Sequence, residues 1–88
     1  MASTQNRLSM LKRLDERAEA AMARLRPIRS LSPMSSAERL KMGRPALNEA
    51  QDALTAIKGL NALAETRKRL EHAIERTEKV LRAQKMAS

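Results

Sequence analysis

Apolar residues recur every three or four positions through the first third of the chain. Alternating gaps of three and four place side chains along one face of an α-helix, in the heptad spacing of packed helices. We therefore predict a helix over about residues 4–26, ended by Pro27, because proline lacks a backbone N–H and disfavours helical geometry at the residue before it. The apolar positions are Leu11, Leu14, Ala18, Ala21, Leu25 and Ile28.

A segment rich in serine and proline interrupts the pattern over residues 28–36, and we predict a linker there. At its end, Ser35 and Glu38 have the spacing of a capping box, in which the serine side chain binds a backbone N–H of the first helical turn. This motif predicts a short helix over about residues 36–42.

Gly43 and Pro45 are expected to separate that short helix from a longer one over about residues 45–85. Glycine is common just past the end of a helix, and proline is favoured at the first helical position. The apolar stripe of the longer helix slips by one residue around Gly59, and a glycine inside a helix costs about 1 kcal/mol relative to alanine. We therefore predict a kink or a break near Gly59.

The composition favours an all-α protein with a thin core. Fifteen Ala and twelve Leu are strong helix formers, whereas one Val and no aromatic residue leave little from which to build a strand. We expect residues 1–88 to form one helical hairpin or bundle that a second copy or a partner completes, because the large apolar side chains are few. The residues expected to carry that association, called the seam, are Leu11, Leu14, Ala18, Ala21, Leu25, Leu63, Leu70, Ile74 and Leu81.

Several classes of protein do not fit this sequence. The chain has no cysteine, which excludes a disulfide scaffold and a thiolate metal site. It has no run of 18 apolar residues and no apolar signal core near its first residues. We expect a protein that is neither secreted nor transmembrane, located in the cytoplasm or within a virion or other nucleoprotein particle.

Candidate catalytic and metal chemistry is sparse. His72 is the single histidine, and with Glu71 beside it and Glu75 one turn on it could supply two ligands of a metal site, whereas a bound metal ordinarily takes three or four. The serines have no base positioned to activate them. We therefore expect no enzyme activity, no metal, no cofactor and no small-molecule substrate.

The charge distribution is the most informative chemical feature. Eighteen Lys and Arg against ten Asp and Glu give a net charge of +8, and arginine suits phosphate and carboxylate groups alike. The alternative to such a binding surface is a solvated face that keeps the chain soluble. Membrane binding is not expected, because the helices lack aromatic anchors. The residues expected to contact phosphate or an acidic partner are Arg24, Arg26, Arg29, Arg39, Lys41, Arg44, Arg67, Lys68 and Arg69.

The five residues from Gly43 to Leu47 begin with Gly-Arg-Pro, and they resemble the arm that precedes the helix-turn-helix of Hin-type recombinases. In that family the arm lies in the DNA minor groove, so the resemblance implies a small DNA-binding regulator. The sequence departs from the family pattern further on, because residues 62–85 form one uninterrupted helical pattern with no second turn before a recognition helix. The alternative interpretation of the tripeptide is that Gly43 ends one helix and Pro45 begins the next.

These observations together favour a non-enzymatic helical assembly protein. Its role would be that of a small basic subunit or adaptor of a larger complex, such as a nucleoprotein particle or a phage virion. Two alternatives stay open: a DNA-binding regulator that uses the Gly-Arg-Pro arm, and a helical adaptor or inhibitor of one acidic protein target.

Overall fold

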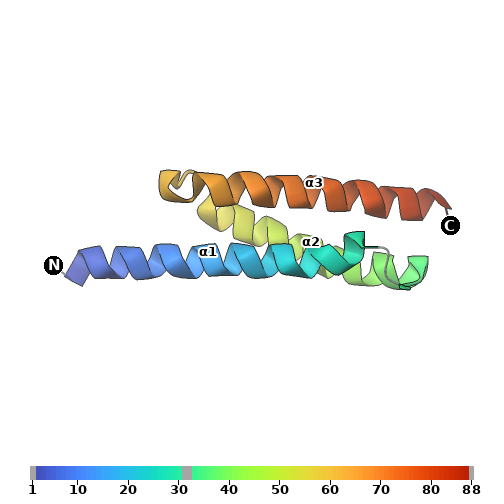
Figure 1. The fold of residues 1–88 in the computed structure, drawn as a ribbon, viewed down its shortest axis with the longest axis horizontal. Helices are drawn as coiled ribbons and strands as arrows, with labels where there is room; N and C mark the ends of the chain where they lie inside the picture. Colours follow the sequence, from blue (N-terminus) through green and yellow to red (C-terminus); the bar gives the residue numbers. More distant parts are fainter. Residues whose placement is uncertain (1, 31–32, 88) are drawn as a thin grey trace.

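The structure, a computed structural model, describes residues 2–30 and 33–87, and every element in these ranges is helical. The elements are α1 (Ala2–Arg29), α2 (Ser36–Ile57), the 3-10 turn η1 (Asn61–Leu63) and α3 (Ala64–Ala87). The chain runs up, down and up again, so that α1 and α3 are parallel and α2 is antiparallel to both (Figure 1). The result is a three-helix rod of 56 × 18 × 17 Å, which confirms the all-α prediction.

The first helix does not end at Pro27, and that prediction is wrong. α1 continues to Arg29, and its last turn closes with hydrogen bonds from the Ser30 N–H to the Arg26 carbonyl and from the Ser30 hydroxyl to the Pro27 carbonyl. The linker is therefore shorter than residues 28–36, since its first two residues belong to α1 and Ser36 belongs to α2. Residues 31–32 of that predicted linker lie outside the described residues.

The predicted boundary at Gly43 and Pro45 is also wrong, because α2 runs through both residues. Gly43 is buried where α2 crosses α3, and a Cβ built on it would lie 2.7 Å from both Cδ atoms of Leu81. The glycine therefore serves close helix packing and does not end a helix. The predicted start of the helix is confirmed, because the Ser35 hydroxyl accepts a hydrogen bond of 3.2 Å from the Glu38 N–H.

Both helix-internal prolines lie on the solvent side of the bundle. Proline at position i leaves the carbonyl of residue i−4 without its usual donor. For Pro27 that residue is Ala23, and for Pro45 it is Lys41, and all four residues are exposed. Water can therefore bind the two carbonyls, while the buried face of each helix stays intact.

The break near Gly59 is confirmed. α2 ends at Ile57, and Gly59 has a φ of +89°, which L-residues with a Cβ rarely adopt. The chain then turns through η1 into α3. The predicted long helix is thus two helices that fold back on each other, and α3, with 24 residues, nearly matches α1, with 28.

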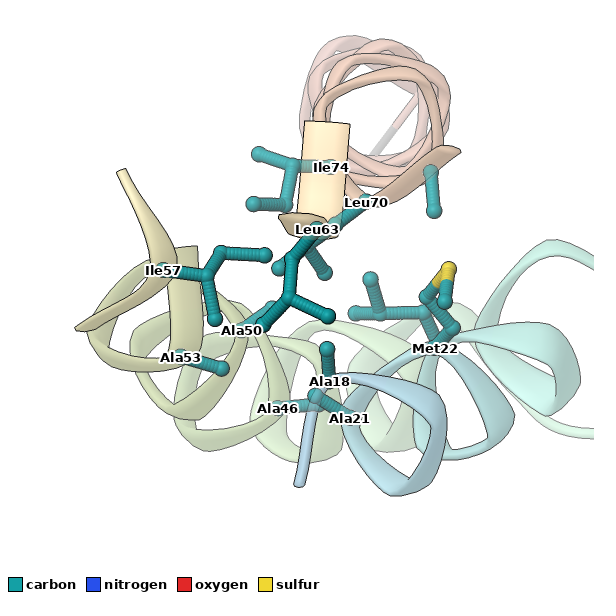
Figure 2. Packing of buried hydrophobic residues seen from close by; sticks show 12 residues of the cluster. Ala18, Ala21, Met22, Ala46, Ala50, Ala53, Ile57, Leu63, Leu70 and Ile74 are labelled. Carbon is teal, nitrogen blue, oxygen red and sulfur yellow. The ribbon is translucent and has the colours of Figure 1, made fainter. Parts of the chain in front are cut away.

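Alanine forms much of the core at which the three helices meet. Figure 2 shows Ala18 and Ala21 of α1 near Ala46 of α2, with Leu63 and Leu70 reaching in from the side of α3. Small side chains let helix axes approach closely, so few large residues are needed to fill the remaining space. The largest side chains that are fully buried are Leu25, Ile28, Ile57, Leu70 and Thr77.

Polar contacts between helices fix how far each helix is shifted along its neighbours. The Thr66 hydroxyl of α3 donates to the Asp15 carboxylate of α1 over 2.6 Å, and Arg69 pairs with Glu19 one turn further along. At the other end the Ser36 hydroxyl of α2 donates to the Gln84 side-chain oxygen of α3. The first two contacts place the middle of α1 beside the start of α3, and the third places the start of α2 beside the end of α3.

The alanine core predicts that the same substitution changes the free energy of unfolding very differently at two adjacent positions of α1. Ala21 is fully buried, whereas Ala20 is exposed. Ala21→Leu should lower the free energy of unfolding by about 1–3 kcal/mol, because overpacking forces the helices apart. Ala20→Leu should change it by less than about 0.5 kcal/mol. Urea denaturation followed by circular dichroism measures both, and equal effects would show that α1 does not pack through this face.

Candidate anion-binding groove between the first and third helices

The seam residues lie inside one chain. Ala18, Ala21 and Leu25 of α1 are buried against the other helices, as are Leu63, Leu70 and Ile74. Leu11 and Leu14 are half-buried against the same core, and Leu81 lies over Gly43. Intramolecular packing therefore accounts for most of the apolar stripe, and association with a second copy or a partner stays a prediction.

The up-down-up topology gathers positive charge at one end of the rod. This basic end consists of residues 20–30, 33–45 and 72–87, which the chain direction places together at the right of Figure 1. It holds ten Lys and Arg against three Asp and Glu, a net charge of +7. The rest of the chain holds eight basic and seven acidic residues, a net charge of +1. The molecule is therefore strongly polarised along its length.

A groove of about 330 Å³ lies between α1 and α3, at the inner boundary of the basic end. We call it the α1–α3 groove. Its polar lining is entirely basic or imidazole, with no carboxylate. The lining residues are Met22, Arg26 and Arg29 of α1, and Lys68, Arg69, His72, Ala73 and Arg76 of α3.

Helical spacing presents these side chains from both walls. Arg26 and Arg29 lie in the last turns of α1, where the negative end of the helix dipole favours cations. On α3, Lys68, His72 and Arg76 are four residues apart and so share one face.

The electrostatics of the groove are repulsive. Partial burial lowers the pKa of Arg29 from its usual value, and the positive charges of Arg76 and Arg26 lower it further. Within the described part of the chain, neither Arg26, Arg29 nor Arg76 has an ion pair or a side-chain hydrogen bond. A bound anion would relieve this repulsion.

Four of the predicted contact residues line the groove, namely Arg26, Arg29, Lys68 and Arg69, and the other five lie elsewhere. Lys41 and Arg44 are exposed on α2 at the basic end, on a different side from the groove. Three of the arginines are engaged by carboxylates: Arg24 by Glu49 of α2 at 2.5 Å, Arg67 by Glu71 at 3.4 Å, and Arg69 by Glu19.

Arg39 has a structural position. It is buried, and its Nη1 donates hydrogen bonds of 2.8 Å to the carbonyls of Ile28 and Ser30. Nη2 lies 3.4 Å from the Met34 carbonyl. The guanidinium therefore caps the C-terminus of α1, where carbonyls lack helical donors, and it ties α2 to the connection that precedes it.

The Gly43-Arg44-Pro45 tripeptide is helical, and it is not an extended arm. It lies within α2, with Gly43 packed against Leu81 of α3. Reaching into a DNA groove as an arm would require this part of α2 to unfold. The separate arm that the resemblance to Hin-type recombinases implies is therefore absent from this structure, because these residues belong to α2.

The sequence analysis missed Arg76, and it considered His72 only as a metal ligand. Both face Arg26 and Arg29 across the groove. The spacing of four residues from Lys68 through His72 to Arg76 was visible in the sequence. What was not visible is that this face of α3 lies against the end of α1.

Other features of the structure bear on function. In the described ranges, no three His, Asp or Glu side chains are grouped so that they could hold a metal ion. None of the helices drawn from those residues has both the length and the apolar character needed to cross a bilayer. Comparison with protein-family models, curated proteins and solved structures gave no match.

Arg39 generates a stability prediction. Arg39→Met keeps a long aliphatic stem but removes the guanidinium that donates to the buried Ile28 carbonyl. This loss should lower the free energy of unfolding by about 1–3 kcal/mol. Lys41→Met, on the exposed side of the same helix, is the matched control, with an expected change below about 0.5 kcal/mol. Denaturation in urea measures both variants. If Arg39→Met were as stable as the control, the capping role would be wrong.

Proposed function

We propose that this chain is a non-enzymatic helical interaction protein, a small subunit or adaptor of a nucleoprotein assembly, whose basic end binds nucleic-acid phosphates. The observation that carries the proposal is the separation of charge along the rod. Ten basic residues meet three acidic residues at one end, although they come from three segments distant in the sequence. A field of this kind attracts polyanions from solution and orients them toward one end.

Two features favour the backbone of a nucleic-acid duplex as the polyanion. A duplex presents about one negative charge every 1.7 Å along its axis, which matches an extended basic surface better than an isolated carboxylate does. The chain has no aromatic residue, so it lacks the stacking platforms with which proteins hold the bases of single strands. Binding would therefore be electrostatic and largely independent of base sequence.

The two other functions differ in what they require. An adaptor for an acidic protein would use the same arginines, because their planar fork binds carboxylates as well as phosphates, so this alternative becomes an outcome of the binding test. A sequence-specific DNA-binding regulator would need side chains that reach base edges. The arm suggested for that purpose is part of α2.

The assembly contact would lie at the opposite end of the rod. The first turns of α1 extend past the turn between α2 and α3 (Figure 1). Leu8 and Met10 are exposed there, and Leu8 continues the α1 stripe three residues before Leu11. An unpaired apolar stripe on a projecting helix is a surface on which another helix can pack.

Duplex binding across a salt series tests the nucleic-acid proposal. If the basic end neutralises about five phosphates, the slope of log affinity against log salt should be near −4.5, and affinity should fall several hundredfold between about 50 and 200 mM salt. Gel shift or fluorescence anisotropy with two duplexes of unrelated sequence measures it. Polyglutamate of equal charge is the control. Stronger binding to polyglutamate than to DNA would favour an acidic protein partner and overturn the proposal.

Light scattering coupled to size exclusion tests the assembly contact. The native chain should have a mass above 9.9 kDa that rises with concentration, and Leu8→Gln should return it to that of one chain. Circular dichroism should be unchanged, because Leu8 is 62% exposed and lies outside the core. A single-chain mass for the native protein at every concentration would contradict self-association through this stripe.

A further inference from the structure

Arg29 is the most buried arginine of the α1–α3 groove, because the other three arginines that line it are exposed. It is partly buried and has no carboxylate partner among the described residues. Arg76 faces it from α3, and Arg26 lies one turn away on α1. Three guanidinium groups thus line one short stretch of groove, over a floor formed by the buried Met22 and Ala73.

We propose that the α1–α3 groove is a discrete site for one phosphate group, held between Arg29 of α1 and Arg76 of α3. The inference rests on the proposed function and deepens it, since it names the point at which the basic end makes a specific contact. Each guanidinium offers a planar fork of N–H donors that matches two phosphate oxygens. The apolar floor excludes water from one side and so strengthens the charge–charge attraction.

Two other grooves between helices, formed by described residues, do not share this character. The groove between α2 and α3 includes Glu78 among its basic neighbours, and the groove between α1 and α2 includes Glu49, which pairs with Arg24. A carboxylate in the lining neutralises part of the charge and competes for the arginines. In the α1–α3 groove, Arg69 is paired with Glu19, which lies outside the lining, whereas the described residues give no ion pair to Arg26, Arg29 or Arg76. The α1–α3 groove holds a larger excess of positive charge, in a volume equal to roughly ten water molecules.

The phosphate group has two chemical sources, a free phosphate ion or a phosphodiester of a nucleic-acid backbone. His72 provides a local reporter for either, because it lines the groove and is the single histidine of the chain. Its imidazole C–H protons give NMR signals that no other residue duplicates. A ligand seated between the two arginines should shift these signals.

The experiment titrates the 88-residue chain at constant pH and ionic strength, replacing chloride by inorganic phosphate in one series and adding a short duplex DNA in another. The variants are Arg29→Gln and Arg76→Gln. Arg82→Gln is the matched control, because it removes one exposed arginine from α3 at the same basic end but from a different groove. Arg76→Lys keeps the charge and removes the fork. Circular dichroism confirms that each variant is folded.

The proposal expects a saturable shift of the His72 signals in the native chain and in Arg82→Gln. Arg29→Gln and Arg76→Gln should each weaken phosphate affinity about tenfold or more. The phosphate affinity of Arg76→Lys should lie between those of the two Gln variants and that of the native chain. A matching loss of duplex affinity, and a salt slope smaller by about 0.9 in Arg29→Gln and in Arg76→Gln, would identify the backbone phosphodiester as the source. A response to phosphate alone would identify the free ion.

Two results would overturn the site. One is a His72 shift that never saturates, and the other is an equal loss of phosphate affinity in Arg76→Gln and Arg82→Gln. Either result would indicate nonspecific electrostatic attraction without a discrete phosphate-binding site. Duplex binding that persists in that case leaves the proposed function standing. Saturable phosphate binding without any duplex binding would have the opposite meaning, since the site would hold while the nucleic-acid role failed.

Discussion

The whole structure depends on how closely three helices can approach through their alanine faces. Ala18, Ala21 and Ala50 are fully buried, and each contributes only a methyl group to the contact. The helices therefore pack with little apolar volume between them, and a few larger side chains such as Leu25 and Leu70 fill what remains. Close approach through alanine explains how a chain without Phe, Tyr or Trp forms a closed bundle only 18 × 17 Å across.

A thin bundle has a consequence for its charges. Side chains on the flanks of closely packed helices lie near one another at the boundary between the helices. Basic residues of α1 and α3 therefore line the same groove. The interhelical contacts from Asp15 and Glu19 set the register that places Arg29 across from Arg76. The same small side chains that permit the fold therefore produce the electrostatic repulsion on which the proposed site is based.

Prediction from sequence succeeded where the signal was local and failed where a local signal competed with packing. The capping serine at position 35 and the break at Gly59 were predicted because a side-chain cap and a positive φ act within a few residues. Pro27 and Gly43 were misjudged because each suits a helix end when considered alone. In the bundle, the burial of Ile28 keeps α1 helical past the proline, and the contact with Leu81 uses the missing side chain of Gly43.

The sequence by itself determined that the chain is helical, that an apolar stripe runs along residues 11–25, and that the net charge is +8. Periodicity and composition suffice for these properties, because each depends on the residue and its near neighbours. Only the tertiary structure decided that the apolar stripe closes on its own chain, that Arg39 caps a helix, and that Arg29 meets Arg76. These depend on chain direction and interhelical register, which are set by contacts between residues about fifty positions apart.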